Sequence, residues 1–164
     1  MSRSLGAELT PALVRRLSQE DLPARLGRVV PLITVDAAGR PHPMLCSYLE
    51  LLAVDTRTVR AAIAARGGSA RNLAERRAAT LLLIEPGLVV YVKCRAAGPP
   101  LVLGDLARFD LAVEDVLEDV ATGWEEGVGI TAGIAYAPLP ALDSPEARRV
   151  LAALRAHGSA ERGR

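Results

Sequence analysis

Short runs of apolar residues, many of them β-branched, alternate with turn residues over most of the chain. Runs of this length that end at Gly, Pro or Asp predict β-strands joined by hairpins. The expected strands cover residues 28–36, 41–52, 58–65, 79–85, 88–96 and 101 to about 117. The turns between them are expected at 36–40, 55–58, 86–87 and 97–100, and a further short apolar element at 130–137.

Three other segments have the spacing of amphipathic helices. Residues 9–20 contain an N-cap candidate, Thr10, followed by Pro11, and helix starts favour this order. A second helix is expected over 69–77. A third is expected over about 144–156, where a capping side chain precedes Pro and Glu. Few helices among hairpin-linked strands indicate a mainly β protein, an antiparallel barrel or sandwich rather than βαβ units.

At 164 residues the chain is expected to form a single domain over 1–164. Half of the residues are hydrophobic and 24% are charged, a globular composition. The net charge is +1 and no long basic block occurs, so we expect neither a nucleic-acid partner nor a membrane. Aromatic residues make up only 3%, too few for a stacking platform that binds single strands.

Two cysteines, Cys46 and Cys94, stand far apart in apolar runs without metal-ligand spacing. We expect both to be small buried hydrophobes, with a disulfide between them as the alternative, and we expect no metal site. The N-terminus has no apolar signal core and no run reaches membrane-spanning length. A cytoplasmic location is therefore expected.

The segment 59–73 predicts a strand, a glycine pair and the start of a helix. The glycines at 67–68 are expected to take backbone angles that other residues resist, and Ser69 is expected to cap the helix. The free N–H groups of a helix start favour an anion, and Arg66 and Arg71 add positive charge. The segment therefore predicts a phosphate site at the end of a strand. The alternative is an ordinary strand–turn–helix junction with solvated arginines.

Three stretches follow one another in a specific order. They are the hairpin Val-Asp-Ala-Ala-Gly-Arg-Pro-His-Pro at 35–43, the strand–loop–helix Ala-Ala-Ile-Ala-Ala-Arg-Gly-Gly-Ser-Ala-Arg-Asn-Leu at 61–73, and the strand 79–85 with its hairpin return. The first is similar to an aspartate-glycine-x-proline turn and the second to an S-x-x-N-L segment. From about 28 to 137 the chain thus resembles the pyridoxamine 5′-phosphate oxidase-like, FMN-binding split-barrel family. The resemblance implies a six-stranded antiparallel split β-barrel that forms a homodimer and holds FMN at the subunit interface.

The resemblance also implies which residues would meet the cofactor. Backbone groups of the second and third strands would hold the isoalloxazine ring, along which Pro43, Ser47, Ala62 and Ile63 would lie. Side chains around the strand–helix junction would hold the phosphate, and these are Arg66, Ser69, Arg71 and Asn72.

The chain departs from the family pattern at three positions. Ser69 stands where many members have a lysine. Ser47 and Leu52 stand where pyridoxamine phosphate oxidases carry an arginine and a lysine. Arg66 or Arg71 would substitute for the lysine, because arginine binds phosphate through two parallel hydrogen bonds.

No nucleophile–base pair, Gly-x-Ser-x-Gly elbow or His-Glu-x-x-His run is visible in the sequence. We therefore name no catalytic residue, and in an enzyme the cofactor would supply the reactive atom. The leading interpretation is an FMN-dependent oxidoreductase that acts on a small molecule. The alternatives are a non-catalytic flavin-binding dimer, and a split barrel that binds F420, haem or no ligand.

Several residues have both a functional and a structural interpretation. His42 would contact a ring edge or substrate, or be an exposed turn histidine. Trp124 would stack on a flavin or pack at a surface. Asn72 would bond the loop that shapes the site, or lie on the helix surface. The carboxylates at 114, 115, 118 and 119 would hold a metal or form a solvated face, and we expect the solvated face.

Overall fold

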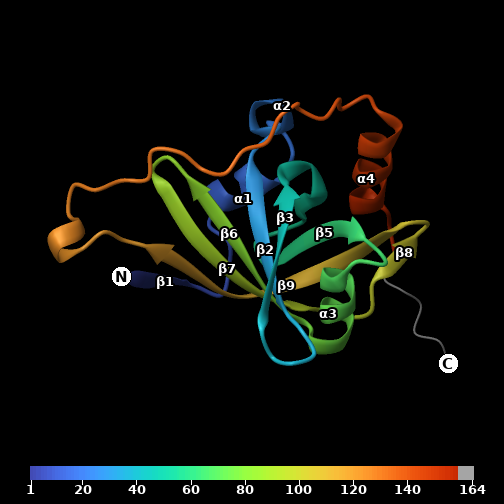
Figure 1. Ribbon diagram of the computed structural model, residues 1–164, viewed down its shortest axis with the longest axis horizontal. Coiled ribbons are helices and arrows are strands. Elements are labelled where there is room, and N and C mark those ends of the chain that lie inside the picture. The colour runs from blue at the N-terminus through green and yellow to red at the C-terminus, as the bar shows by residue number, and fades with distance from the viewer. Residues whose placement is uncertain (159–164) are drawn as a thin grey trace.

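The computed structural model describes residues 1–158 as one antiparallel sheet of nine strands with four helices against it (Figure 1). Residues 159–164 and the side chain of Trp124 lie outside the described part. The strands are β1 Ser2–Gly6, β2 Val29–Val35, β3 Pro41–Ser47, β4 Leu51–Ala53, β5 Thr58–Ala64, β6 Ala78–Glu85, β7 Leu88–Ala96, β8 Leu101–Leu103 and β9 Leu106–Asp119. The helices are α1 Pro11–Leu17, α2 Leu22–Arg25, α3 Gly68–Arg76 and α4 Pro145–Arg155, with 3-10 turns η1 Tyr48–Glu50 and η2 Gly123–Glu125.

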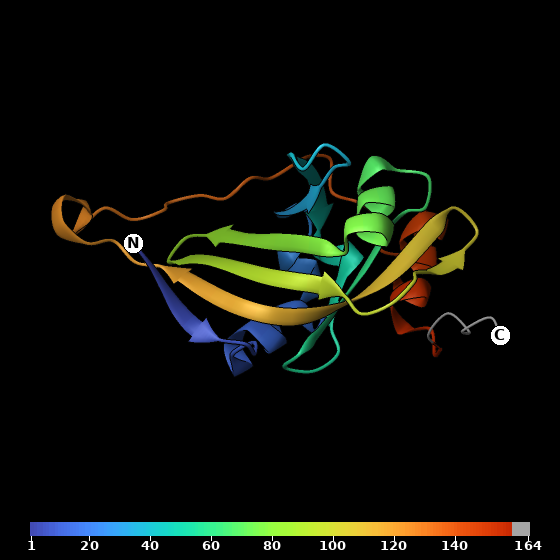
Figure 2. The same cartoon turned by 90° about the horizontal axis from the view of Figure 1, so that it is seen from below.

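The main path of the sheet runs β3-β2-β6-β7-β9-β5-β4, and β1 and β8 pair with β9. The two outer strands of this path, β3 and β4, follow each other in the chain and are joined by η1. The chain itself therefore closes the curled sheet, with β3, η1 and β4 as one bent strand. When β3 and β4 are counted as one strand, the seven strands of the path correspond to the six predicted barrel strands. Figure 2 shows β6, β7 and β9 curling side by side.

The predicted hairpins and helix starts are confirmed in their local geometry. In the β2–β3 turn, Gly39 has φ +79° and the Asp36 carboxylate accepts the N–H groups of Ala38 and Arg40, each at 2.9 Å. Thr10 caps the start of α1, and its hydroxyl accepts the N–H of Leu13 at 3.3 Å. Ser144 caps α4, and its hydroxyl accepts the N–H of Ala147 at 3.1 Å. These side chains satisfy N–H groups that a helix start leaves free.

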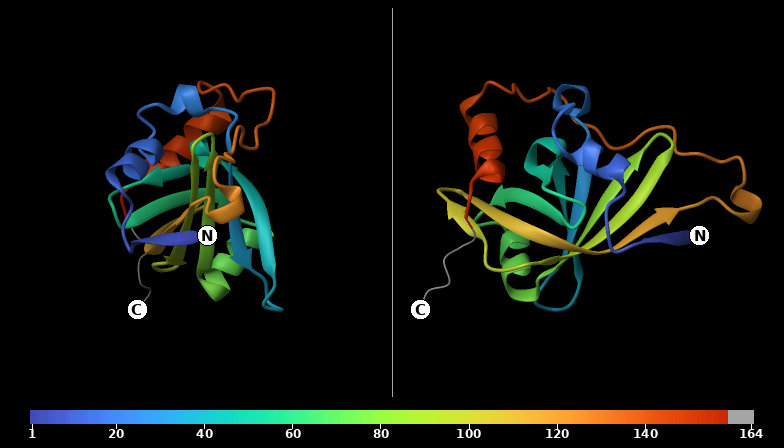
Figure 3. Two further views of the ribbon diagram at one scale, coloured as in Figure 1. Left: turned by 90° about the vertical axis from the view of Figure 1, so that its left-hand side faces the viewer. Right: turned by 180° about the vertical axis from the view of Figure 1, so that it is seen from behind.

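One predicted strand is wrong as a continuous element. The stretch 41–52 bends at Ser47, because the N–H and hydroxyl of Ser47 both donate to the carboxylate of Glu50, at 2.6 and 2.9 Å. The stretch 130–137 forms a single bridge, between Ala135 and Arg28, and no strand. It belongs to an arm, residues 120–144, that extends beyond the β9 end and returns past β6 and β7 to α4 (Figure 3).

Strand β1 was not predicted, because its residues show no apolar alternation and all of them are exposed. Strand β1 pairs with β9 from Ser2 opposite Asp119 to Gly6 opposite Val116, and the hydroxyl of Ser4 donates to the carboxylate of Asp115 at 2.9 Å. The mixed stretch 101–120 resolves into the β8–β9 hairpin, whose turn contains Gly104 at φ +66°.

Mostly aliphatic side chains fill the barrel, together with Phe109, the single phenylalanine of the chain. Cys46 and Cys94 are free thiols inside this core, as small hydrophobes, so the disulfide alternative is wrong. Burial raises the pKa of the Cys94 thiol to about 12. Neither cysteine is therefore a reactive thiolate at neutral pH.

A buried carboxylate, Glu85, joins the closure of the barrel to the two N-terminal helices. It accepts the hydroxyl of Tyr48 from η1 and a guanidinium of Arg28, and it lies 2.5 Å from Arg16 and 3.7 Å from Arg25. Burial by itself would raise the pKa of Glu85, but the Tyr48 hydrogen bond and the charge of Arg16 lower it below its ordinary value. Glu85 is therefore ionised and shared by three guanidinium groups.

Replacing Glu85 by Gln should lower the free energy of unfolding by about 3–5 kcal/mol, because the guanidinium groups lose their buried counter-charge. Urea denaturation at pH 7 measures this. The matched control is Glu114→Gln, whose pair with Arg95 is 46% and 51% exposed and should contribute under about 1 kcal/mol. Equal losses in the two variants would contradict the structural role of Glu85.

The same carboxylate predicts how stability depends on pH. Because the pKa of Glu85 is lower in the folded chain than in the unfolded chain, its contribution is complete above the unfolded pKa and is lost as the pH falls through the folded pKa. Between roughly pH 5 and pH 3 the unmodified chain should lose stability more steeply than Glu85→Gln. Parallel curves of unfolding free energy against pH would exclude this linkage.

Candidate functional site

Two of the four predicted phosphate residues border a groove between the β2–β3 hairpin and the start of α3. Figure 1 shows the turn of this hairpin beside α3. The groove has a volume of about 320 Å³ and is lined by Asp36, Ala37, Ala38, Arg40, His42, Gly68, Arg71, Asn72 and Glu75. Of the four predicted residues, the structure brings Arg71 and Asn72 into this groove, whereas Arg66 and Ser69 are not part of its lining.

Helix α3 begins with Gly67 as its N-cap, so the predicted cap by Ser69 is wrong. Ser69 is the second residue of the helix and is buried. Neither glycine takes a positive φ, so backbone freedom is not what requires them. Gly68 allows a close approach instead, because a Cβ there would lie 3.2 Å from Nε2 of His42. The half-buried His42 ring therefore lies directly against the helix start.

Buried hydrogen bonds hold the two walls of the groove together. Nδ2 of Asn72 donates to the hydroxyl of Thr34 at 3.0 Å, and that hydroxyl donates to the carbonyl of His42 at 3.2 Å. On the surface, Arg76 donates to the carbonyl of Ala37 at 2.8 Å. Asn72 thus positions the hairpin against α3. Thr34, which sequence reasoning did not single out, connects them.

The charges at the groove leave Arg71 available for an anion. The Arg40 guanidinium pairs with the Asp36 carboxylate at 2.9 Å. The pKa of Asp36 is lowered, chiefly by the hydrogen bond that it accepts from the backbone N–H of Arg40. Arg71 is exposed beside Gly68, with the exposed Glu75 one turn further along α3. A phosphate at this helix start would meet the first free N–H groups of α3 and the Arg71 guanidinium.

The residues predicted along the flavin ring do not share one open surface. Pro43 is exposed on the edge strand β3, while Ser47 is buried and bonded to Glu50. Ala62 and Ile63 are neighbours on β5 and so point to opposite faces of the sheet. Ile63 lies in the barrel core, and Ala62 lies in a separate cluster beneath α4.

Helix α4 covers the outer face of β5 at this point. Ala153 and Leu154 of α4 form a buried cluster with Ala62, and Leu52, Leu106 and Val150 pack against it. Leu52 is the position at which the resembling oxidases carry a lysine. The described residues therefore fit the phosphate end of a flavin, whereas α4 occupies the face expected to meet the ring.

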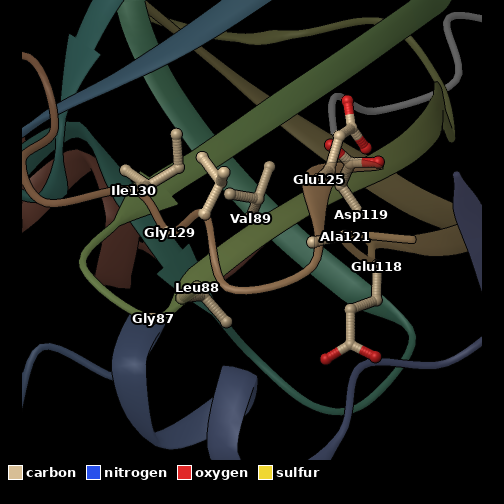
Figure 4. Close-up of a pocket in the computed structure, with 10 residues that line it drawn as sticks. Gly87, Leu88, Val89, Glu118, Asp119, Ala121, Glu125, Gly129 and Ile130 are labelled. Atoms are coloured by element: carbon tan, nitrogen blue, oxygen red, sulfur yellow. The ribbon is translucent and has the colours of Figure 1, made fainter. Parts of the chain in front are cut away.

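A second hollow of about 310 Å³ lies between β7, the end of β9 and the arm (Figure 4). Its wall combines apolar side chains with carboxylates and contains no residue predicted for the cofactor. Glu118 lies 2.5 Å from Arg3, and Asp119 lies 3.6 Å from the N-terminal ammonium group. These carboxylates are paired within the fold.

Two further carboxylates of β9 are also paired, Glu114 with Arg95 at 2.6 Å and Asp115 with Lys93 at 3.9 Å. Within residues 1–158, His, Cys, Asp and Glu form no group of three or more that could hold a metal ion. No described helix is both long enough and apolar enough to cross a membrane.

No protein-family model matches the chain, and no curated protein matches its sequence. Solved structures do match its fold. A candidate pyridoxamine 5′-phosphate oxidase from Lactobacillus delbrueckii is 18% identical, with a TM-score of 0.53 over 70% of this chain and 98% of that one. Group A Streptococcus HupZ is 14% identical, with a TM-score of 0.53 over 76% and 100%. An FMN-binding protein from Syntrophomonas wolfei is 13% identical, with a TM-score of 0.52 over 68% and 92%.

These similarities confirm the predicted fold. The chain has the split-barrel fold of pyridoxamine 5′-phosphate oxidase-like proteins, since the matches span nearly the whole of each of these structures. At these identities the likeness concerns the fold alone.

Replacing Asn72 by Ala should lower the free energy of unfolding by about 1–2 kcal/mol, because it removes the buried hydrogen bond to Thr34. Chemical denaturation measures the loss. Glu75→Ala, an exposed change on the same helix, is the control and should stay within about 0.5 kcal/mol of the unmodified chain. A loss no greater for Asn72→Ala than for the control would mean that Asn72 does not hold the groove.

Proposed function

We propose that this chain binds FMN, with the phosphate in the groove between the β2–β3 hairpin and α3, and that it is an oxidoreductase acting on a small molecule. The observation that carries the proposal is the exposed Arg71 beside the open start of α3. A helix start and an arginine together favour a phosphate. The fold supports the proposal, because a structure that shares it is an FMN-binding protein.

In this proposal Arg71, Asn72 and Arg66 have separate roles at and beside the groove. Arg71 and the first amides of α3 bind the phosphate, and Asn72 positions the hairpin through Thr34. Arg66, exposed in the turn before α3, adds positive charge near the phosphate. Bound FMN would supply the hydride or electron transfer.

A non-catalytic flavin-binding protein is the second candidate, and the closed face beneath α4 favours it. While α4 covers Ala62, a small molecule has no access to that part of the expected ring site. Reduction of bound FMN by a nicotinamide donor supports the oxidoreductase. Flavin that stays oxidised with every donor tried supports the non-catalytic protein.

We also propose that the chain works as a homodimer. Leu45 on the edge strand β3 is 59% exposed, and Pro41 and Pro43 on the same strand are exposed as well. An exposed apolar patch on an unpaired sheet edge is typical of an interaction surface. A second copy of the chain would cover this edge.

Replacing Arg71 by Gln should weaken FMN binding at least about tenfold, because a charge-assisted hydrogen bond contributes roughly 1.5–3 kcal/mol. Quenching of FMN fluorescence measures the affinity. Riboflavin, which lacks the phosphate, should bind both forms equally. Arg57→Gln, a change at the exposed partner of Glu8, should leave FMN binding unchanged. Purified protein that neither contains FMN nor takes it up would refute the proposal.

Replacing Leu45 by Glu should convert the proposed dimer to a monomer, because the carboxylate would be desolvated in the interface. Sedimentation velocity measures the mass in solution. The matched control is Val102→Glu on β8, where the natural side chain is also 59% exposed. An unmodified chain that sediments as a monomer would refute the dimer. Dissociation by Val102→Glu alone would place the interface at β8.

A further inference from the structure

Two arginines on the outer face of the sheet are held beneath the end of α4. Arg108 on β9 is only 2% exposed and donates to the carbonyls of Ala156 and Gly158, at 2.5 and 2.6 Å. Arg60 on β5 donates to the carbonyl of Leu154 at 2.9 Å. The last turn of α4 therefore supplies a carbonyl acceptor for Arg60, and the residues directly after the helix supply those for Arg108.

The charge beneath α4 is not balanced by the described residues around it. The carboxylate within reach of both arginines is Asp110, 3.2 Å from Nε of Arg60 and 3.3 Å from Nε of Arg108. The two guanidinium groups thus share one carboxylate, and their other hydrogen bonds go to uncharged backbone carbonyls. Burying a cation is costly unless it is well paired. A ligand with stronger acceptor atoms would therefore compete with the end of α4 for these arginines.

Helix α4 packs on the barrel through one short apolar face. Ala147, Ala153 and Leu154 of this helix are fully buried, and Val150 and Leu151 are partly buried against the core. The arm that leads to α4 contains η2 as its one regular element within the described residues. The barrel path of strands does not include α4, so displacement of the helix would break no strand pairing.

The surface beneath α4 has a definite chemical character. Ala62, Leu52 and Leu106 form an apolar floor, and Arg60 and Arg108 place donors at its edge. Both donors already bind carbonyl oxygens. The surface therefore matches a flat apolar ring with carbonyl oxygens along one edge.

We propose that the outer face of β5 and β9 is a ligand site that α4 fills in the closed form, and that Arg60 and Arg108 bind the carbonyl edge of a flat ring once α4 has moved. This inference rests on the proposed function. For FMN the carbonyl edge is the pyrimidine end of the isoalloxazine ring, and Ala62 then lies against the ring. The arginines exchange the carbonyls of α4 for those of the ligand.

Three full-length variants and one exchange measurement test this inference. Leu154→Ala loosens α4 and leaves both arginines in place, so FMN affinity should rise about tenfold or more as the open form becomes more populated. Adding Arg60→Gln to Leu154→Ala should lower the affinity at least about tenfold relative to Leu154→Ala. Arg148→Ala, an exposed change on α4, is the control and should alter nothing. In the unmodified chain, saturating FMN should speed amide hydrogen exchange over 147–155.

The contrary outcomes are distinct. If Arg60 only anchors α4, Arg60→Gln will leave the affinity of Leu154→Ala unchanged or raise it, and the inference is overturned while FMN binding stands. Slower or unchanged exchange of α4 in the FMN complex also overturns it, and this measurement decides the matter if Leu154→Ala does not fold. FMN that binds neither the unmodified chain nor Leu154→Ala overturns the proposed function and this inference together.

Discussion

The barrel depends on the closure that η1 makes between β3 and β4. These strands are the two open edges of the sheet path, and only the three residues Tyr48–Glu50 separate them. Glu85 at the end of β6 accepts the Tyr48 hydroxyl, and the same carboxylate meets arginines from α1 and α2. A buried carboxylate that loses its partners is costly. The closure at η1 and the helices α1 and α2 are therefore expected to fold and unfold together.

The sequence predicts the barrel well because strand signals are local. Strand β6 follows an alternating burial pattern over its whole length, and the glycine of the β2–β3 turn takes the positive φ that such a turn needs. Two missed features also carry local signals. Ser47 and Glu50 have the spacing of a capping box, which marks η1. Gly104-Asp105 is a hairpin dipeptide, which marks the turn between β8 and β9.

The site is predicted less well, because it depends on contacts between distant segments. The glycines at the start of α3 are visible in the sequence, but the close contact of Gly68 with the His42 ring of β3 is not. Asn72 was singled out for the loop, whereas Thr34, its buried partner, has no motif of its own. Arg60 and Arg108 come together only through the register of β5 and β9 and the return of α4. No local pattern contains that information.

Strand β5 connects the groove to the face beneath α4. Its outer side carries Arg60 and Ala62, and its end leads through Gly67 into α3. At about 3.3 Å per residue, Arg60 lies about 13 Å along the strand from Ala64. Because β5 is paired to β9 over its whole length, the two places keep a fixed separation. A ligand that reaches from one to the other therefore needs only α4 to move, while the barrel stays as it is.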